Sequence, residues 1–267
     1  MKLENWGYEI LDLDDQKEYS ENPEMSVMAN AVELLNTRLL SSLDREAVLL
    51  EIGCGSYSLL KNNMKSPAVW EGIDVIDFDR RGKPSVATRR ASVEDIPWPD
   101  DSFDIVVSNQ SIEHWYEYGV DVNRGLSEIR RTLKEGGRAV LNFPIHLHGQ
   151  KMFVLGDFAA IDSAFSKAGL DIVSRVAVIK SGIPQYRGWR LCGFPDSLVR
   201  KLPGHEDCSY VVEYVAARSA TEPRDTVPWV KKPKLNAIQR QLHYGLPYLA
   251  WKIGSRFLRR ARAREAG

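Results

Sequence analysis

Short apolar runs alternate with helix-like segments through the middle of this chain. Residues 47–60, AVLLEIGCGSYSLL, begin as an uninterrupted apolar run, which is typical of a strand buried on both faces of a parallel sheet. Further strands are predicted at 69–75, 88–91, 103–108, 138–143 and 171–180, and helices at 58–64, 120–133 and 157–168. Strands and helices that alternate over short loops predict a parallel sheet with helices on both faces.

Two more segments complete the predicted fold. Residues 209–217, containing YVVEYVAA, follow a stretch too short for a crossover helix, so we expect an antiparallel edge strand there. The fold class is then α/β, a doubly wound, mostly parallel seven-stranded sheet with an antiparallel edge strand. The helix at 120–133 is expected to stop at Gly136-Gly137, with Lys134 in its last turn.

Three regions are predicted from changes in composition. Residues 1–45 form an acidic segment and a helix that either caps the mouth of the sheet or packs on it as an ordinary helix. Residues 46–217 form the α/β domain. Residues 218–267 form a proline-rich basic linker and an amphipathic tail, whose apolar positions recur at helical spacing opposite many arginines. The tail suits an anionic membrane surface, docking on the domain, or a frayed end.

The overall composition is that of an ordinary globular protein. It is 43% hydrophobic and 27% charged, with a formal net charge of zero. Three scattered cysteines make neither a disulfide framework nor a metal cluster, and no signal peptide or membrane-spanning run is visible. We therefore expect a cytoplasmic protein, with the tail as a possible contact to the inner face of the membrane. Nucleic acid is not expected as a partner, because the body of the chain shows no basic face.

A glycine turn and a downstream acid are the first candidate functional residues. Gly53 and Gly55 follow the first strand and let the backbone approach a ligand closely. Asp74 stands near the end of the next strand, about 20 residues further on, where such folds place an acid that binds ribose hydroxyls. Asp77 and Asp79 are the competing acids; Asp74 is preferred because it falls at the strand end.

The motifs EIGCG, GIDV, SVEDIPWPDDSFDIVVSNQSIEH and EIRRTLKEGGRAVLNFP resemble, in order and spacing, class I S-adenosylmethionine-dependent methyltransferases. The small-molecule group called methyltransferase type 11 is the most similar, over residues 47–144. The resemblance implies a Rossmann-like methyltransferase fold and S-adenosylmethionine as cofactor. It also implies that Glu51, Gly53 and Gly55 line the methionine part, Asp74 the ribose, Ser92 and Val93 the adenine, and Asn109 the sulfonium, with Cys54, Val75, Glu94 and Gln110 beside them.

Two positions depart from the family pattern. Tyr57 stands where the family has a third glycine, and we expect it to narrow the space over the cofactor. Ser92 stands where the family has an aspartate that holds the adenine amine, so one hydrogen bond is weakened.

Three histidines are candidates for the base that takes a proton from a hydroxyl acceptor. His114, His146 and His148 follow predicted strand ends, and an imidazole titrates near neutral pH. Packing without a catalytic role is the alternative for each. The pair His146 and His148 could instead ligate a metal together with Asp157 or Glu113, although no metal is part of the preferred interpretation.

An aromatic and arginine-rich segment is the candidate acceptor site. Tyr186, Arg187, Trp189 and Arg190 offer rings for stacking and guanidinium groups for a sugar or an anionic group, and a surface loop folded under its own aromatics is the alternative. The predicted function is methyl transfer to a small-molecule or glycan acceptor, with oxygen favoured. The rival functions are a nicotinamide-dependent oxidoreductase and a binding module without catalysis.

Overall fold

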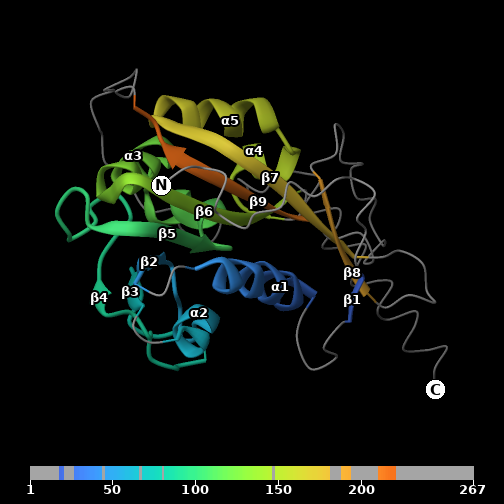
Figure 1. Cartoon of the computed structure of the whole chain (residues 1–267), viewed down its shortest axis with the longest axis horizontal. Coiled ribbons are helices and arrows are strands. Elements are labelled where there is room, and N and C mark those ends of the chain that lie inside the picture. Colours follow the sequence, from blue (N-terminus) through green and yellow to red (C-terminus); the bar gives the residue numbers. More distant parts are fainter. Residues whose placement is uncertain are drawn as a thin grey trace.

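A single mixed β-sheet organises the molecule (Figure 1). The computed structural model describes residues 18–20, 27–43, 46–65, 68–79, 81–145, 148–180, 188–193 and 210–220. Within them the strands are β1 (Glu18–Ser20), β2 (Val48–Ile52), β3 (Val69–Asp74), β4 (Arg89–Arg90), β5 (Phe103–Asn109), β6 (Leu133–Ile145), β7 (Leu170–Lys180), β8 (Gly188–Gly193) and β9 (Tyr210–Arg218). Their order in the sheet is β1-β8-β7-β9-β6-β5-β2-β3-β4.

The predicted fold class is confirmed by this topology. Strands β4, β3, β2, β5 and β6 pair in parallel, as the continuous apolar runs predicted. Strand β9 pairs antiparallel with both β6 and β7, so β7 runs in the same direction as β6. These seven strands form the doubly wound core of the sheet.

The edge position predicted for the last strand was wrong, although its antiparallel direction was right. Strand β9 lies between β6 and β7, and its Val211, Val212 and Tyr214 are fully buried. The edge beyond β7 is instead formed by β8 and β1, which pair antiparallel with each other. Because β8 occupies the outer side of β7, the returning chain fills the inner position. The largely apolar run of β9 indicates burial on both faces of the sheet, but it does not specify which strands lie beside it.

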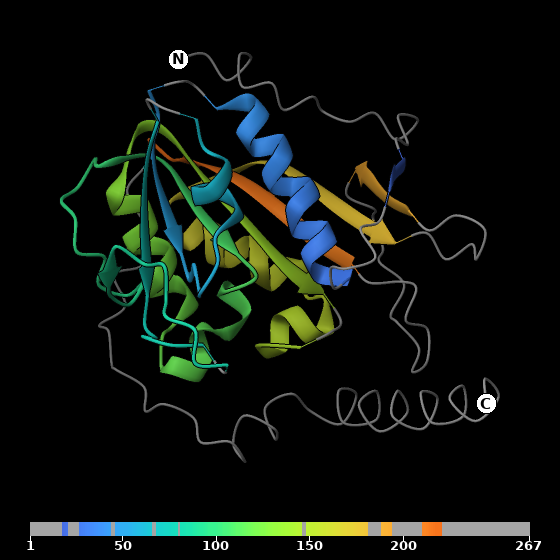
Figure 2. The same cartoon turned by 90° about the horizontal axis from the view of Figure 1, so that it is seen from below.

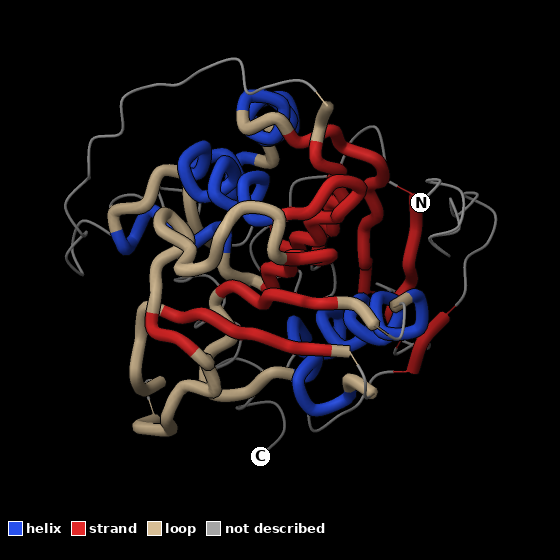
Figure 3. Tube along the Cα trace, turned by 60° about the vertical axis from the view of Figure 1, so that its left-hand side comes forward, coloured by secondary structure: helices blue, strands red, loops and turns tan. Residues whose placement is uncertain are grey.

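Helices cover both faces of the sheet (Figures 1 and 3). They are α1 (Val27–Ser42), α2 (Leu59–Asn63), the 3₁₀ helix η2 (Ile112–Tyr118), α3 (Val122–Thr132), α4 (Lys151–Leu155) and α5 (Phe158–Lys167). One face packs against α3, α4 and α5, where Phe143 of β6 lies 4.8 Å from Phe153 of α4 between ring centroids. The other face packs against α1 and α2 (Figure 2). The sheet is therefore the middle of three layers.

Helix α1 lies on the sheet itself. Ala31 and Leu35 pack with Val178 of β7 and Val211 of β9, and Leu39 packs with strands further along. This packing agrees with the alternative of an ordinary helix on the sheet. Among the described residues, no helix is long and apolar enough to cross a membrane.

The predicted glycine stop of α3 was wrong. The helix ends at Thr132, because Leu133 already pairs with Phe103 of β5, and Lys134 lies in β6. The register then jumps from Leu133 to Arg138, and Gly136, at φ +76°, makes the bend inside the strand. Strand pairing thus overrides the local helix-stop signal. The two glycines instead lie in an irregular part of β6, where the pairing with β5 shifts.

Candidate functional site

The turn after β2 brings the backbone close to a neighbouring loop. Gly53 has φ +70°, and a Cβ atom placed on it would lie 2.6 Å from Cβ of Ser111. The amide of Gly53 donates to the carbonyl of Ile73 at 2.8 Å, which ties the turn to β3. Ser58 then caps α2 by accepting a hydrogen bond from the amide of Lys61 at 2.9 Å. Only glycine fits this position without a shift of the Ser111 loop.

A cavity of about 260 Å³ opens where β2, β3 and β5 end, and we call it the strand-end cavity. It is lined by Ile52, Gly53, Gly55, Ile73, Asp74, Val75, Ile76, Ala91, Ser92, Val93, Gln110, Ser111, His114, Trp115, Glu117, Tyr118 and Val120. The carboxyl ends of parallel strands are where open α/β sheets bind ligands. The cavity therefore has the position of a small-molecule site, and its volume is slightly below the roughly 300–1,000 Å³ that such sites usually have.

Asp74 joins the glycine turn to the end of β3. Its Oδ2 accepts a hydrogen bond from the amide of Gly55 at 2.8 Å, and its Oδ1 accepts one from the amide of Ile76 at 3.0 Å. Each carboxylate oxygen can accept a further bond, so the group can still bind ligand hydroxyls from its place in the cavity wall. The competing acids are engaged elsewhere. Asp77 pairs with Arg90, and Asp79 accepts from Ser56 and from loop amides.

Glu51 lies behind the cavity in a buried polar chain. It is 3% exposed and accepts hydrogen bonds from Ser58, from Nε1 of Trp70 at 3.0 Å and from Nδ2 of Asn109 at 3.1 Å. Burial raises the pKa of Glu51, and the hydrogen bonds oppose that rise in part. The chain continues as Asn142 donates to Oδ1 of Asn109 at 2.6 Å.

Gln110 ends this chain at the cavity wall. Its Nε2 donates to Oδ1 of Asn142 at 3.1 Å, and its φ is +53°. A non-glycine residue in this region stores strain that persists only where surrounding contacts hold it, and such residues concentrate at functional sites. The chain of amides from Glu51 thus fixes the backbone at the end of β5.

The structure divides the residues predicted to hold the cofactor into two groups. Gly53, Gly55, Asp74, Val75, Ser92, Val93 and Gln110 line the strand-end cavity. Glu51, Cys54, Glu94 and Asn109 are not among the lining residues. The thiol of Cys54 points to the carbonyl of Ile73, and burial together with the charges of Glu51 and Asp74 raises its pKa to about 12.

Tyr57 does not narrow the cavity. Its side chain is 65% exposed and is absent from the lining residues, so the expected crowding over the cofactor was wrong. The turn carries residue 57 outward before α2 begins at Leu59. Ser92, the other departure from the family pattern, does lie in the cavity wall.

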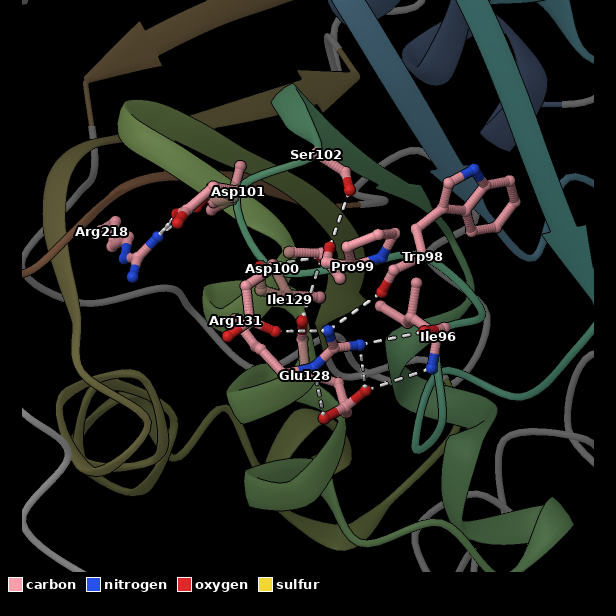
Figure 4. A network of polar contacts seen from close by, with 12 residues as sticks. Ile96, Trp98, Pro99, Asp100, Asp101, Ser102, Glu128, Ile129, Arg131 and Arg218 are labelled. Atoms are coloured by element: carbon pink, nitrogen blue, oxygen red, sulfur yellow. Dashed lines mark hydrogen bonds and ion pairs between the residues drawn. The ribbon is translucent and has the colours of Figure 1, made fainter.

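The wall at Ser92 and Val93 is followed by a loop that is bound to Arg131 of α3 (Figure 4). Arg131 of α3 donates to the carbonyls of Ile96 and Trp98 at 2.9 Å each and to Glu128 and Asp100. The amide of Ile96 donates to the same Glu128 at 3.1 Å. This network anchors the connection from β4 to β5 on α3, and with it the wall residues that precede it.

The histidines gather next to the cavity. His114 of η2 lines it, and its Nδ1 lies 2.6 Å from Oε1 of Glu117. His148 stacks on His114 with ring centroids 4.9 Å apart and an interplanar angle of 23°. Two of the three predicted histidines therefore meet at one place. The third, His146, lies outside the described residues, and Asp157, the alternative metal partner, caps α5.

The candidate acceptor residues are placed only in part. Tyr186 and Arg187 lie outside the described residues, whereas the backbone of Trp189 and Arg190 lies in β8. Strands β6, β9 and β7 separate β8 from β5. At roughly 4.8 Å a strand, that places β8 roughly 19 Å from β5 across the sheet.

Several cavity residues were missed by the sequence analysis. Ser111 lines the cavity from the position before η2, and η2 and the turn after it contribute Trp115, Glu117, Tyr118 and Val120. The aromatic cluster WYEY directly after a strand end was the available signal, since loops at that edge carry binding residues.

Comparison with known proteins agrees with this geometry. Residues 50–141 match the family described as a methyltransferase domain, Methyltransf_11. The uncharacterized protein YafE of Escherichia coli K12 is 38% identical over 63 residues, which are 24% of this chain and 28% of YafE. The chloroplastic 2-methyl-6-phytyl-1,4-hydroquinone methyltransferase 1 of Oryza sativa subsp. japonica is 49% identical over 53 residues, 20% of this chain and 15% of that protein.

Among solved structures, that of the [4+2]-cyclase SpnF superposes with a TM-score of 0.51 at 18% identity. It covers 77% of this chain and 87% of SpnF, and it shows a shared fold. The chain spans less than a third of the length of the two curated relatives named above. The matched segment contains every residue that lines the strand-end cavity. Residues 50–141 therefore match a methyltransferase domain, which agrees with the resemblance of the sequence motifs to this family.

Proposed function

We propose that this protein transfers a methyl group from S-adenosylmethionine to a small-molecule or glycan acceptor, at oxygen. The observation that carries the proposal is the strand-end cavity. There the close-packed turn at Gly53, the carboxylate of Asp74 and the wall at Ser92 and Val93 converge from separate strands. This set of groups suits a nucleoside ligand with an extended polar arm.

The residues fit the implied cofactor. Asp74 would accept hydrogen bonds from the ribose hydroxyls, Val93 would contact the base, and the turn at Gly53 and Gly55 would accommodate the amino-acid arm. When bound, S-adenosylmethionine supplies an electrophilic methyl group on a sulfonium. The chain then has to align an acceptor with that methyl group, and alignment alone can contribute several powers of ten in rate.

The proposal of oxygen as the acceptor atom rests on the side chains beside the cavity. A hydroxyl acceptor must lose its proton as the new bond forms, and His114 stands in the cavity wall with Glu117 bonded to its Nδ1. That carboxylate fixes the orientation of the ring and stabilises the imidazolium that forms when the ring takes a proton. We therefore assign removal of the proton from the acceptor hydroxyl to the part of the cavity wall around His114.

Ligand-dependent unfolding tests the donor. S-adenosylmethionine and S-adenosylhomocysteine should raise the melting temperature, whereas NAD should not, because binding to the folded state alone stabilises it. Stabilisation by NAD instead would support the rival oxidoreductase. A screen of labelled methyl transfer onto pooled saccharides and lipids then tests the acceptor class, and a label that stays on the donor with every pool would contradict the proposal.

The second candidate function is that of a binding module, which keeps the methyltransferase fold without methyl transfer. The observation that favours it is the structural likeness to SpnF, which is named as a [4+2]-cyclase. Donor binding without methyl transfer to any acceptor pool would support this candidate.

From the sequence alone we also propose that the basic tail, which lies outside the described residues, binds anionic membranes. Co-sedimentation with vesicles that contain phosphatidylserine, compared with neutral vesicles, tests this. Equal recovery with both would contradict it.

A further inference from the structure

Glu113 is a buried carboxylate that has no role in the methyl transfer proposed above. Its side chain is 0% exposed, and neither carboxylate oxygen has a hydrogen-bond partner among the described residues. A buried carboxylate costs several kcal/mol unless a cation or hydrogen-bond donors compensate it. A buried carboxylate without hydrogen-bond partners therefore indicates that a cation or a hydrogen-bond donor binds there.

Two imidazole nitrogens approach the same carboxylate oxygen. Nε2 of His148 lies 3.7 Å and Nε2 of His114 lies 3.9 Å from Oε1 of Glu113. One ligand atom from each of the three residues can be chosen so that all lie within 4.8 Å of one another. These distances are too long for hydrogen bonds, but they surround a space that one ion can occupy.

A second carboxylate sets the direction of one histidine. Oε1 of Glu117 lies 2.6 Å from Nδ1 of His114, while Nε2 of the same ring faces Glu113. Metal-binding histidines commonly donate their other nitrogen to a carboxylate in this way, which fixes the tautomer and makes the ligand nitrogen more basic.

The backbone holds these side chains in place. Gly149 has φ +99°, and a Cβ atom on it would lie 2.6 Å from Cβ of Glu113. The amide of Gln150 donates to the carbonyl of Glu113 at 2.8 Å. The segment that carries His148 is therefore packed against η2, and the three side chains meet because two separate elements are locked together.

We propose that Glu113, His114 and His148 bind one divalent transition-metal ion next to the strand-end cavity, with zinc as the probe. Two imidazoles and one carboxylate suit zinc and its neighbours better than magnesium or calcium, which prefer oxygen ligands. Zinc bonds of about 2.0–2.2 Å place neighbouring tetrahedral ligands about 3.4 Å apart. The two separations from Glu113, 3.7 and 3.9 Å, need to close by at most about half an ångström, and the two imidazole nitrogens lie within 4.8 Å of each other.

The role proposed for this ion rests on the proposed function. Three protein ligands leave one coordination position open, as in catalytic zinc sites, and His114 connects the ion to the cavity wall. An acceptor hydroxyl bound there becomes more acidic and loses its proton to water. The oxygen then forms the new bond to the methyl carbon, and the electron pair of the broken carbon–sulfur bond stays on sulfur. The imidazoles act as ligands in this arrangement, and the metal replaces a histidine base.

Titration calorimetry of the full, untagged chain with zinc after chelator treatment tests the site. One zinc ion should bind per chain, and cobalt(II) should give the visible absorption of a site with nitrogen ligands. Glu113→Gln and His148→Ala should each weaken zinc binding by more than about 100-fold. Glu117→Gln should weaken it by about 10–100-fold, the usual cost of losing the partner of a ligand. Glu135→Gln, a change at an exposed glutamate, is the matched control and should bind like the parent chain.

Zinc binding by Glu113→Gln as tight as that of the parent chain would overturn the proposal. If Glu113→Gln fails to fold, His148→Ala decides, because the side chain of His148 is 26% exposed and its loss is better tolerated. A cobalt spectrum without nitrogen ligation in the parent chain would also overturn it. The donor is tested separately: stabilisation by S-adenosylmethionine without any zinc binding refutes the metal site alone. Zinc binding without donor binding supports the site and refutes the proposed function alone.

Discussion

Gly53 lies so close to Ser111 that a side chain at this position should destabilise the protein. In Gly53→Ala the new Cβ would lie 2.6 Å from Cβ and 2.9 Å from Oγ of Ser111. An L-residue at φ +70° costs about 1–2 kcal/mol. Movement of Ser111 also breaks its 2.6 Å contact with the hydroxyl of Ser108 and its 3.2 Å bond to the carbonyl of Ile52. Each of these contributes about 0.5–1.5 kcal/mol.

The total expected loss in free energy of unfolding is therefore about 2–5 kcal/mol. Gly82→Ala is the matched control, because Gly82 has φ +75° and no atom within 4 Å of the Cβ position. It should lose only the conformational part, about 1–2 kcal/mol. For a chain of this size each kcal/mol lowers the melting temperature by about 2–4 °C.

Urea unfolding of the two variants separates the conformational cost from the contact cost. We expect Gly53→Ala to be less stable than Gly82→Ala by at least about 1 kcal/mol, and to bind S-adenosylmethionine more weakly because the turn lines the cavity. Equal stability of the two variants, with equal donor affinity, would refute the close-packed turn.

Three further predictions concern single side chains. Asp74→Asn should weaken donor binding by at least about tenfold in calorimetry, since hydrogen bonds to a charged group contribute about 1.5–3 kcal/mol; unchanged affinity would contradict this role. Burial raises the pKa of Glu51 above 4.5, so the stability it contributes is present below that pH and is lost as the pH rises through the folded-state pKa. Urea unfolding of Glu51→Gln should therefore show a smaller fall in stability from about pH 4 to about pH 7 than the parent chain, and an equal fall would exclude this cause. Arg131→Lys should lose about 1–2 kcal/mol in thermal unfolding, because one ammonium group cannot reach Glu128, Asp100 and two carbonyls together; a loss below about 0.5 kcal/mol would speak against the network.

Much of the core sheet could be predicted because its strands are buried on both faces. In β5, Ile105 and Val107 pack toward α1 and α2, while Val106 packs on the opposite face, so the run reads as continuously apolar. The order of the strands in the sheet, in contrast, could not be predicted from these runs. The internal place of β9 depends on β8 taking the outer side of β7, and an apolar run alone does not specify its neighbours.

Local signals failed where tertiary pairing decided the outcome. Gly136 and Gly137 read as a helix stop, but the pairing of Leu133 with Phe103 began the strand earlier. Tyr57 was expected to narrow the cofactor space because it replaces a glycine of the family pattern, whereas its side chain is 65% exposed and does not line the cavity.

In the candidate site, only residues at the ends of strands could be predicted from the sequence. Asp74 was identified because the acid follows a strand at the expected spacing, and the structure places it in the cavity wall. The meeting of His148 with Glu113 and His114 could not be derived, since it depends on how the segment after β6 packs on η2. Sequence spacing gave the candidates, and the packing of these two elements gave the arrangement.

Calorimetric titration with S-adenosylmethionine, of the full parent chain and of Asp74→Asn, tests whether Asp74 in the strand-end cavity binds the methyl donor. We expect one donor molecule to bind per chain, with affinity at least about tenfold weaker in the variant and no binding of NAD to either. Absence of donor binding by the parent chain, or equal affinity in the two, would contradict the claim that the strand-end cavity holds the methyl donor through Asp74.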